Sequence, residues 1–261
     1  MKKRVFFATN GGLLIIGALF FADLVWNTDA ATGFLIHGAI GWRYALLLLG
    51  VLLSALPILY KRQSFAAKPL DAQSVLIGFL VLGIASVCGV VAQIFAAFQG
   101  KAGLLALLKS ALLLLLAVYC AYRLLLAEKA DSGLNFGVMA SLFLYFLTVE
   151  RFLSNASSLY RFAPIESILA ALGALLFFTV LLKTMHYPPE RRPYGQLMAL
   201  GQLAFFLCTC IELPRTIYRF LSGSAALPAV SESLVLAAVG ILGLCAAYAK
   251  AADSKRDKRV K

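Results

Sequence analysis

Residues 205–220, FFLCTCIELPRTIYRF, form an apolar stretch that is interrupted by Glu212, Pro214, Arg215 and Arg219. On a helix, Glu212 and Arg215 lie three residues apart and Arg215 and Arg219 four apart, so the three charges would form a ladder on one face. Charges within hydrocarbon are costly unless they are paired or hydrated. Three interpretations remain open: a ladder that only holds helices together, a site that binds a ligand or an ion, and charges that are simply exposed.

Pro214 gives this stretch a second distinctive feature. It has no N–H to donate to the carbonyl of Cys210, four residues earlier, so it kinks or breaks a helix there. In broken transporter helices, exposed carbonyls beside a carboxylate bind cations, which makes Pro214 a candidate helix break next to Glu212. The alternative is that the proline only marks the end of the helix.

The composition places these residues in a membrane. Of 261 residues, 62% are hydrophobic and 14% are charged, whereas soluble domains average ~45–50% and ~25%. Such a chain cannot hide its apolar surface in water, so we expect an integral membrane protein. The net charge of +12 does not indicate nucleic-acid binding, because the basic residues flank apolar runs and do not form one basic face.

Eight apolar runs are each near the ~20 residues that cross a bilayer as a helix. Because these runs are continuous and do not alternate with period two, they predict helices and exclude a barrel. The first run resembles a signal peptide, but Asp23, Trp26 and Asn27 fit a cleavage region poorly, which favours a retained helix. The fold is therefore predicted to be all-α and polytopic, with one transmembrane domain at 1–249. Its expected helices are 5–26, 41–60, 74–98, 103–126, 134–153, 165–184, 196–219 and 229–249.

The distribution of Lys and Arg predicts the orientation. The two ends of the chain and the loops on their side of the membrane hold 17 of the 24 basic residues. By the positive-inside rule, both termini are cytoplasmic, in a plasma or inner membrane. The basic tail at 250–261 is expected to attract anionic lipid headgroups.

Further charges are predicted at the depth of Glu212. Odd-numbered helices run outward and carry their charge late, as with Glu150, whereas even-numbered helices carry it early. These positions all correspond to the outer leaflet. For Arg43, Arg161 and Arg219 we favour an interfacial girdle of snorkelling side chains. The candidate ligand- or ion-binding residues are Glu212, Arg215, Glu150, Glu166, Glu232 and Lys109.

The second half of the chain contains a probable tandem duplication. Tyr-Arg-Phe occurs at 160–162 and again at 218–220, and Glu-Ser occurs at 166–167 and at 232–233. The fifth and sixth helices would then match the seventh and eighth as two helical hairpins.

Motifs for other chemistry are absent from the sequence. Five cysteines lie within apolar runs without metal-ligand spacing, and His37 and His186 are far apart, so neither a metal nor a cofactor is predicted. There is no P-loop, HExxH or GxSxG, and we expect no enzyme.

Two classes of function lead, and an intramembrane enzyme ranks third because no nucleophile or histidine is placed beside the acids and arginines. The first is a small permease or channel-like transporter of a small solute or ion, with a polar cavity in the outer leaflet. The second is a membrane sensor, regulator or non-catalytic partner subunit whose charges are structural. No particular protein partner is predicted.

Overall fold

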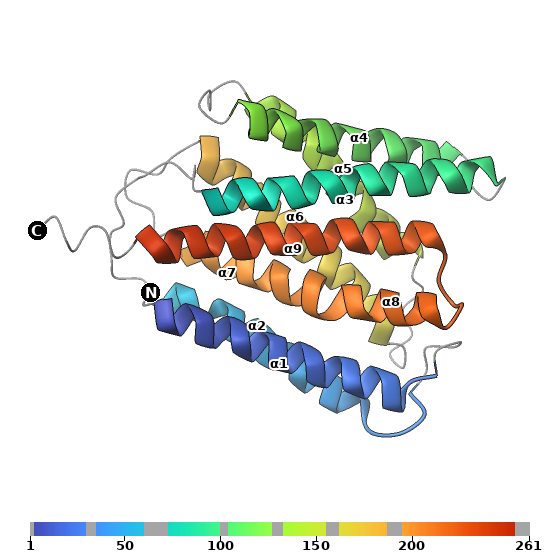
Figure 1. The fold of residues 1–261 in the computed structure, drawn as a ribbon. Helices are drawn as coiled ribbons and strands as arrows, with labels where there is room; N and C mark the ends of the chain where they lie inside the picture. The colour runs from blue at the N-terminus through green and yellow to red at the C-terminus, as the bar shows by residue number, and fades with distance from the viewer. Residues whose placement is uncertain are drawn as a thin grey trace, which may run out of the picture.

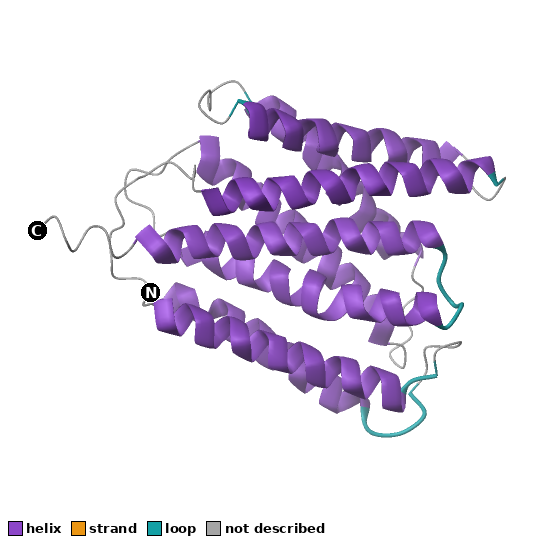
Figure 2. Ribbon diagram, in the orientation of Figure 1, coloured by secondary structure: helices purple, strands orange, loops and turns teal. Residues whose placement is uncertain are grey.

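The computed structural model describes residues 3–29, 35–59, 73–99, 104–126, 133–154, 162–186 and 195–253. Within these residues every regular element is a helix and there is no strand (Figure 2). The elements are α1 (Lys3–Asn27), α2 (Ile40–Leu59), α3 (Gln73–Phe98), α4 (Leu104–Leu125), α5 (Leu134–Ser154), α6 (Phe162–His186), α7 (Gly195–Ala204), the π-helix η2 (Phe205–Glu212), α8 (Leu213–Leu221) and α9 (Leu227–Asp253). Because α7, η2 and α8 form one span, the described chain has eight helices long and apolar enough to cross a membrane, which confirms the predicted fold.

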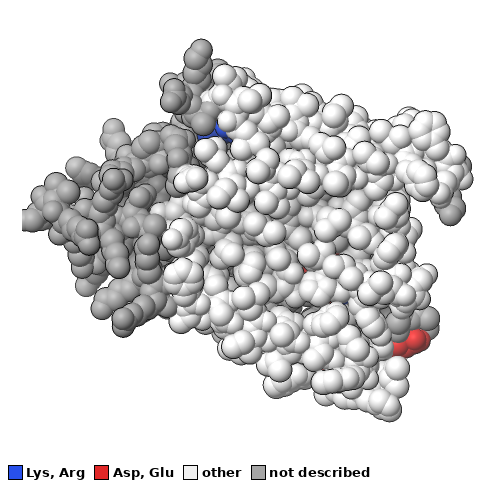
Figure 3. Space-filling view, in the orientation of Figure 1, with Lys and Arg blue, Asp and Glu red and all other residues white. Residues whose placement is uncertain are grey.

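The surface of the bundle is suited to lipid. Large apolar side chains such as Ile15, Leu48, Ile84 and Val91 are exposed midway along their helices. The face drawn in Figure 3 is almost entirely free of charged atoms between its two ends. The chain is therefore a multi-pass integral membrane protein.

The seventh and eighth spans lie at the centre of the bundle. In their most apolar windows, 72% of the seventh span and 67% of the eighth are buried, more than in the other six spans. Helix α9 packs against α3, α7 and η2, and α3 packs in turn against α4 (Figure 1). The start of α1 and the end of α9 lie at the same end of the bundle. We call the half of the bundle away from these ends the distal half.

The seventh span does not end at Pro214, as one of the two sequence interpretations held. It continues as α8 to Leu221, and the irregular part lies before the proline, where η2 covers eight residues. The N–H of Leu213 donates to the carbonyl of Cys208, five residues earlier. A π-helix uses wider i→i+5 hydrogen bonds, so the span continues past the proline as a helix.

Side chains of η2 also bind the backbones of neighbouring helices. Cys208 Sγ donates to the carbonyl of Ala170 on α6 at 3.2 Å, and Thr209 Oγ1 donates to that of Ala237 on α9 at 3.0 Å. Gly17 on α1 also packs closely against η2, because a Cβ added at Gly17 would lie 2.7 Å from Cys210 Cβ. The π-helix is thus held from several sides.

Some sequence predictions lie outside the described residues. These are Tyr160 and Arg161, and the tail from residue 254 onward; α9 itself extends to Asp253. The tandem duplication stays a prediction.

The close crossing of α7 and α9 gives a test of the packing. A Cβ at Gly201 would lie 2.5 Å from the carbonyl oxygen of Gly243, so we expect Gly201→Ala to separate the helices and cost about 1–3 kcal/mol. A lower unfolding temperature in detergent, followed by intrinsic fluorescence, is the expected result. The matched control is Gly11→Ala, because no atom lies within 4 Å of a Cβ there. Equal stability of the two variants would contradict the crossing.

Candidate functional site

The buried charges that form ion pairs gather in the distal half of the bundle, at the ends of their helices that point away from the termini. The buried Arg123, in the last turn of α4, lies toward the opposite end. The described ion pairs fall into three groups, centred on Glu212, on Lys109 and on Arg43.

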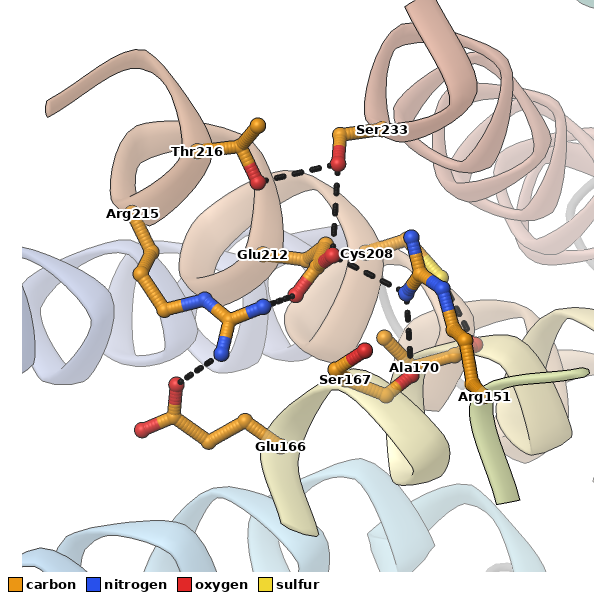
Figure 4. Close-up of polar contacts among 9 residues, drawn as sticks. All are labelled: Arg151, Glu166, Ser167, Ala170, Cys208, Glu212, Arg215, Thr216 and Ser233. Atoms are coloured by element: carbon orange, nitrogen blue, oxygen red, sulfur yellow. Dashed lines mark hydrogen bonds and ion pairs between the residues drawn. The ribbon is translucent and has the colours of Figure 1, made fainter. Parts of the chain in front are cut away.

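Glu212, the last residue of η2, is the centre of the first group. Its side chain is buried, and both of its carboxylate oxygens are used (Figure 4). Arg151 Nη1 on α5 lies 2.9 Å from Oε1, and Arg215 Nη2 on α8 donates to Oε2 at 2.6 Å. Ser233 on α9 also donates to Oε1, at 3.2 Å. The expected contact between Glu212 and Arg215 is therefore present, and it is one part of a larger cluster.

Arg215 and Arg151 extend this cluster to α6. Arg215 Nη1 lies 3.4 Å from Glu166 Oε2, and Arg151 Nη1 donates to the carbonyl of Ser167 at 3.0 Å. The group therefore contains two acids and two bases. We call Arg151, Glu166, Glu212 and Arg215 the balanced cluster.

Lys109 on α4 is the centre of the second group. Its Nζ lies 2.7 Å from Glu150 Oε1 on α5 and 2.7 Å from Glu232 Oε1 on α9. Gln93 Nε2 on α3 donates to the same oxygen of Glu232 at 3.1 Å. This group contains two acids and one base, and we call Lys109, Glu150, Glu232 and Gln93 the unbalanced cluster.

The two clusters share two helices through adjacent residues. On α5, Glu150 belongs to the unbalanced cluster and Arg151 to the balanced one. On α9, Glu232 contacts Lys109 while Ser233 contacts Glu212. Movement of α5 or α9 would therefore change both clusters together.

Arg43 forms the third group and corrects one expectation. The interfacial girdle that was favoured for Arg43 is wrong, because this side chain is buried. Its Nε lies 2.5 Å from Asp23 Oδ2, and its Nη2 donates to Thr28 Oγ1 at 2.5 Å. Asn27 Nδ2 donates to the other oxygen of Asp23, so this pair joins α1 to α2. Arg219 is exposed, in keeping with the interfacial position expected for it.

A cavity of about 470 Å³ opens beside the unbalanced cluster. It lies between the end of α3, the start of α4 and the start of α9, and the side chains of Gln93 and Lys109 contribute to its wall. The remaining lining is mostly apolar, from Ala92, Phe95, Ala96, Leu105, Ala106 and Leu227. Small and apolar walls with a few convergent polar groups are typical of ligand sites.

All six candidate residues thus belong to one of the two clusters, three to each. The sequence reasoning did not include Arg151, Gln93 or Ser233 among the site residues. Arg151 and Ser233 directly follow the candidates Glu150 and Glu232, and Gln93 is a polar residue late in an apolar helix, which is the signal that could have identified it. Pro214 lies between Glu212 and Arg215 of the balanced cluster, at the start of α8.

No known protein family, curated protein or solved structure matches this chain. The function must therefore be argued from the geometry of the clusters and the cavity.

The charge balance of each cluster determines what it can do. Both oxygens of Glu212 are bound by buried partners, two arginines and a serine, so a ligand would have to compete with these partners to bind Glu212. The unbalanced cluster has a net charge of −1 and borders a cavity. The balanced cluster is suited to holding helices together, and the unbalanced cluster to exchanging a partner.

A Glu→Gln substitution in each cluster tests whether the balanced cluster stabilises the bundle more than the unbalanced cluster does. Glu212→Gln removes the charge that neutralises Arg151 and Arg215, and breaking a buried pair in this way costs on the order of 3 kcal/mol. We expect a clear fall in unfolding temperature in detergent. Glu150→Gln leaves Lys109 paired with Glu232, and Glu150 retains 25% side-chain exposure, so little change in unfolding temperature is expected. If Glu150→Gln destabilises the protein as much as Glu212→Gln, this expectation is wrong.

Proposed function

We propose that the protein is a small-solute permease whose solute site is the cavity at the unbalanced cluster. The observation that carries the proposal is a cavity of about 470 Å³ that reaches a buried, incompletely neutralised ion cluster within a bundle of eight spans. Ionisable residues inside a membrane domain most often serve substrate or ion pathways, because their burial is otherwise unfavourable.

The packing below the cavity supports transport by alternating access. Toward the end that carries the termini, Leu113 and Leu116 on α4 and Leu82 on α3 are completely buried in the apolar core. A cavity on one side and close packing on the other is the arrangement expected of a carrier open to one face. The helices that would have to move are α3, α4 and α9, of which α3 packs against both of the others.

In our proposal the cavity faces outward. The helix ends that border it lie opposite the start of α1 and the end of α9, which the distribution of Lys and Arg assigns to the cytoplasm of a cell with a plasma or inner membrane.

Fusion reporters provide a direct check of this orientation. Green fluorescent protein fused after Lys261 should fluoresce, and alkaline phosphatase at the same position should be inactive, because this end is cytoplasmic. Alkaline phosphatase inserted after Gly223, in the turn between α8 and α9, should be active. The reverse pattern of activities would place the cavity on the cytoplasmic side.

Transport itself can be tested by closing the cavity. Ala106 lines the cavity, so Ala106→Phe fills it, whereas Ala111→Phe adds the same bulk on the exposed face of the same helix. In proteoliposomes given a panel of radiolabelled amines, amino acids, sugars and carboxylates, we expect at least one solute to enter with the wild type and with Ala111→Phe. Its uptake should fall to the protein-free rate with Ala106→Phe.

Two results would count against the permease. One is that no solute in the panel enters faster than into protein-free liposomes, and the other is that Ala106→Phe transports as well as Ala111→Phe. The second candidate function, a membrane sensor, regulator or partner subunit, is favoured by the balanced cluster, which joins four elements without facing the described cavity. It predicts that a ligand stabilises the protein without any flux.

A further inference from the structure

We propose that the cavity binds an amphipathic cation, an ammonium group with an apolar body, whose charged head takes the place of the Lys109 ammonium between Glu150 and Glu232. This inference rests on the proposed permease function, because it names the class of substrate for the same site. It follows from the charge of the cluster, the position of Lys109 and the lining of the cavity.

The charge of the cluster selects a cation. Among the described residues, Lys109 is the only base within ion-pair distance of Glu150 and Glu232. Two carboxylates and one ammonium leave a net charge of −1 in surroundings where an unneutralised charge is unfavourable. An anionic ligand in the cavity would add to the excess negative charge. A cationic ligand would bring the charge of the site to zero, because the displaced Lys109 ammonium is tethered to α4 and stays beside the two carboxylates.

The second oxygen of Glu150 points to the same conclusion. Glu150 Oε2 is buried and has no hydrogen-bond partner among the described residues, although Oε1 of the same carboxylate is paired with Lys109. A buried acceptor without a donor is unfavourable by about 1–3 kcal/mol. An ammonium carries three donors and no acceptor, so it supplies what this oxygen lacks.

Lys109 lies between the cavity and the two carboxylates. Its side chain lines the cavity, but those of Glu150 and Glu232 do not, so a ligand reaches the acids by displacing the lysine ammonium. The lysine stem is flexible, with four methylene groups and a compact charge at its end, which allows this exchange without backbone movement. The Lys109 ammonium thus occupies the cation site when no ligand is bound.

The walls of the cavity suit the rest of such a ligand. Phe95, Leu105 and Leu227 are apolar and partly exposed, and they form a surface on which an alkyl or aryl body can be buried. At the polar end, Gln93 Nε2 donates to Glu232, which leaves the amide oxygen of Gln93 to accept from an ammonium. A hydrophilic metal ion such as Na⁺ would make no use of the apolar wall.

Three six-carbon probes with different head groups test the charge preference. Purified protein in detergent is titrated with hexylammonium chloride, hexan-1-ol or sodium hexanoate at constant ionic strength, and its unfolding temperature is followed by intrinsic fluorescence. We expect a saturable rise with hexylammonium that is absent with hexanoate and smaller with hexanol. An equal or larger rise with hexanoate, or no rise with hexylammonium in the wild type, overturns the proposal.

Variants locate the binding in the cavity. Glu232→Gln removes one of the two carboxylates and should weaken hexylammonium binding about tenfold or more. Ala106→Phe should abolish binding, and Ala111→Phe should leave it unchanged. If Glu232→Gln or Ala106→Phe binds hexylammonium as the wild type does, the amine binds elsewhere and the proposal fails.

Lys109→Ala tests whether the Lys109 ammonium and the ligand occupy the same site. Butylammonium carries the charge of the removed ammonium and has the length of the whole lysine side chain, of which alanine keeps only Cβ. It should therefore restore the unfolding temperature of Lys109→Ala and bind this variant at least about tenfold more tightly than the wild type, where it competes with Lys109. Butan-1-ol should restore nothing. Absence of this difference between butylammonium and butan-1-ol contradicts the replacement of Lys109 by ligand.

These measurements are made at equilibrium and do not require transport. Selective binding of hexylammonium without uptake of any amine in proteoliposomes would reject the permease and keep the cation site. Uptake of a carboxylate or a sugar without selective binding of hexylammonium would keep the permease and reject the cation site.

Discussion

A charged group within hydrocarbon must be neutralised by a partner from the same protein, and this constraint organises the bundle. Glu212 satisfies it with Arg151, Arg215 and Ser233, which belong to α5, α8 and α9. Arg215 adds Glu166 on α6. Helices in lipid gain no hydrophobic force for association, so such contacts and close packing must determine which helices are neighbours. The balanced cluster therefore fixes the arrangement of the central spans.

The unbalanced cluster departs from this rule beside the cavity that we propose as the solute site. Its two carboxylates share one ammonium, and they do so next to a cavity and one residue away from the balanced cluster on both α5 and α9. A change at Lys109 thus affects α5 and α9, the two helices that also supply Arg151 and Ser233 to Glu212. The coupling gives a ligand in the cavity a physical route to shift the packing of the core.

The sequence was sufficient for some of these features and insufficient for others. Long apolar runs gave the eight spans, because hydrophobic length is a local property. Charge placement gave all six candidate residues, but not their pairing, since contacts such as that between Lys109 and Glu232 join residues 123 positions apart and depend on how each helix is rotated. The same limit led to the wrong expectation for Arg43, whose partner Asp23 lies on another helix. The π-helix was also missed, because no local pattern distinguishes it from an interrupted α-helix. The proline indicated an irregularity at the carbonyl of Cys210, which lies within η2, but not the length of that irregularity.

The separation between Lys109 and Glu232 has a consequence for biogenesis. Chains enter the membrane from the amino end, so α4 and α5 are made long before α9. Until α9 arrives, Lys109 has Glu150 as its partner, and the central groove beside α3 lacks the helix that fills it. Of the eight described spans, the last to be synthesised is thus the one that completes both polar clusters, through Glu232 and Ser233. An incomplete chain would carry exposed charges in the bilayer, a feature by which the quality-control machinery of a cell can distinguish it from the finished protein.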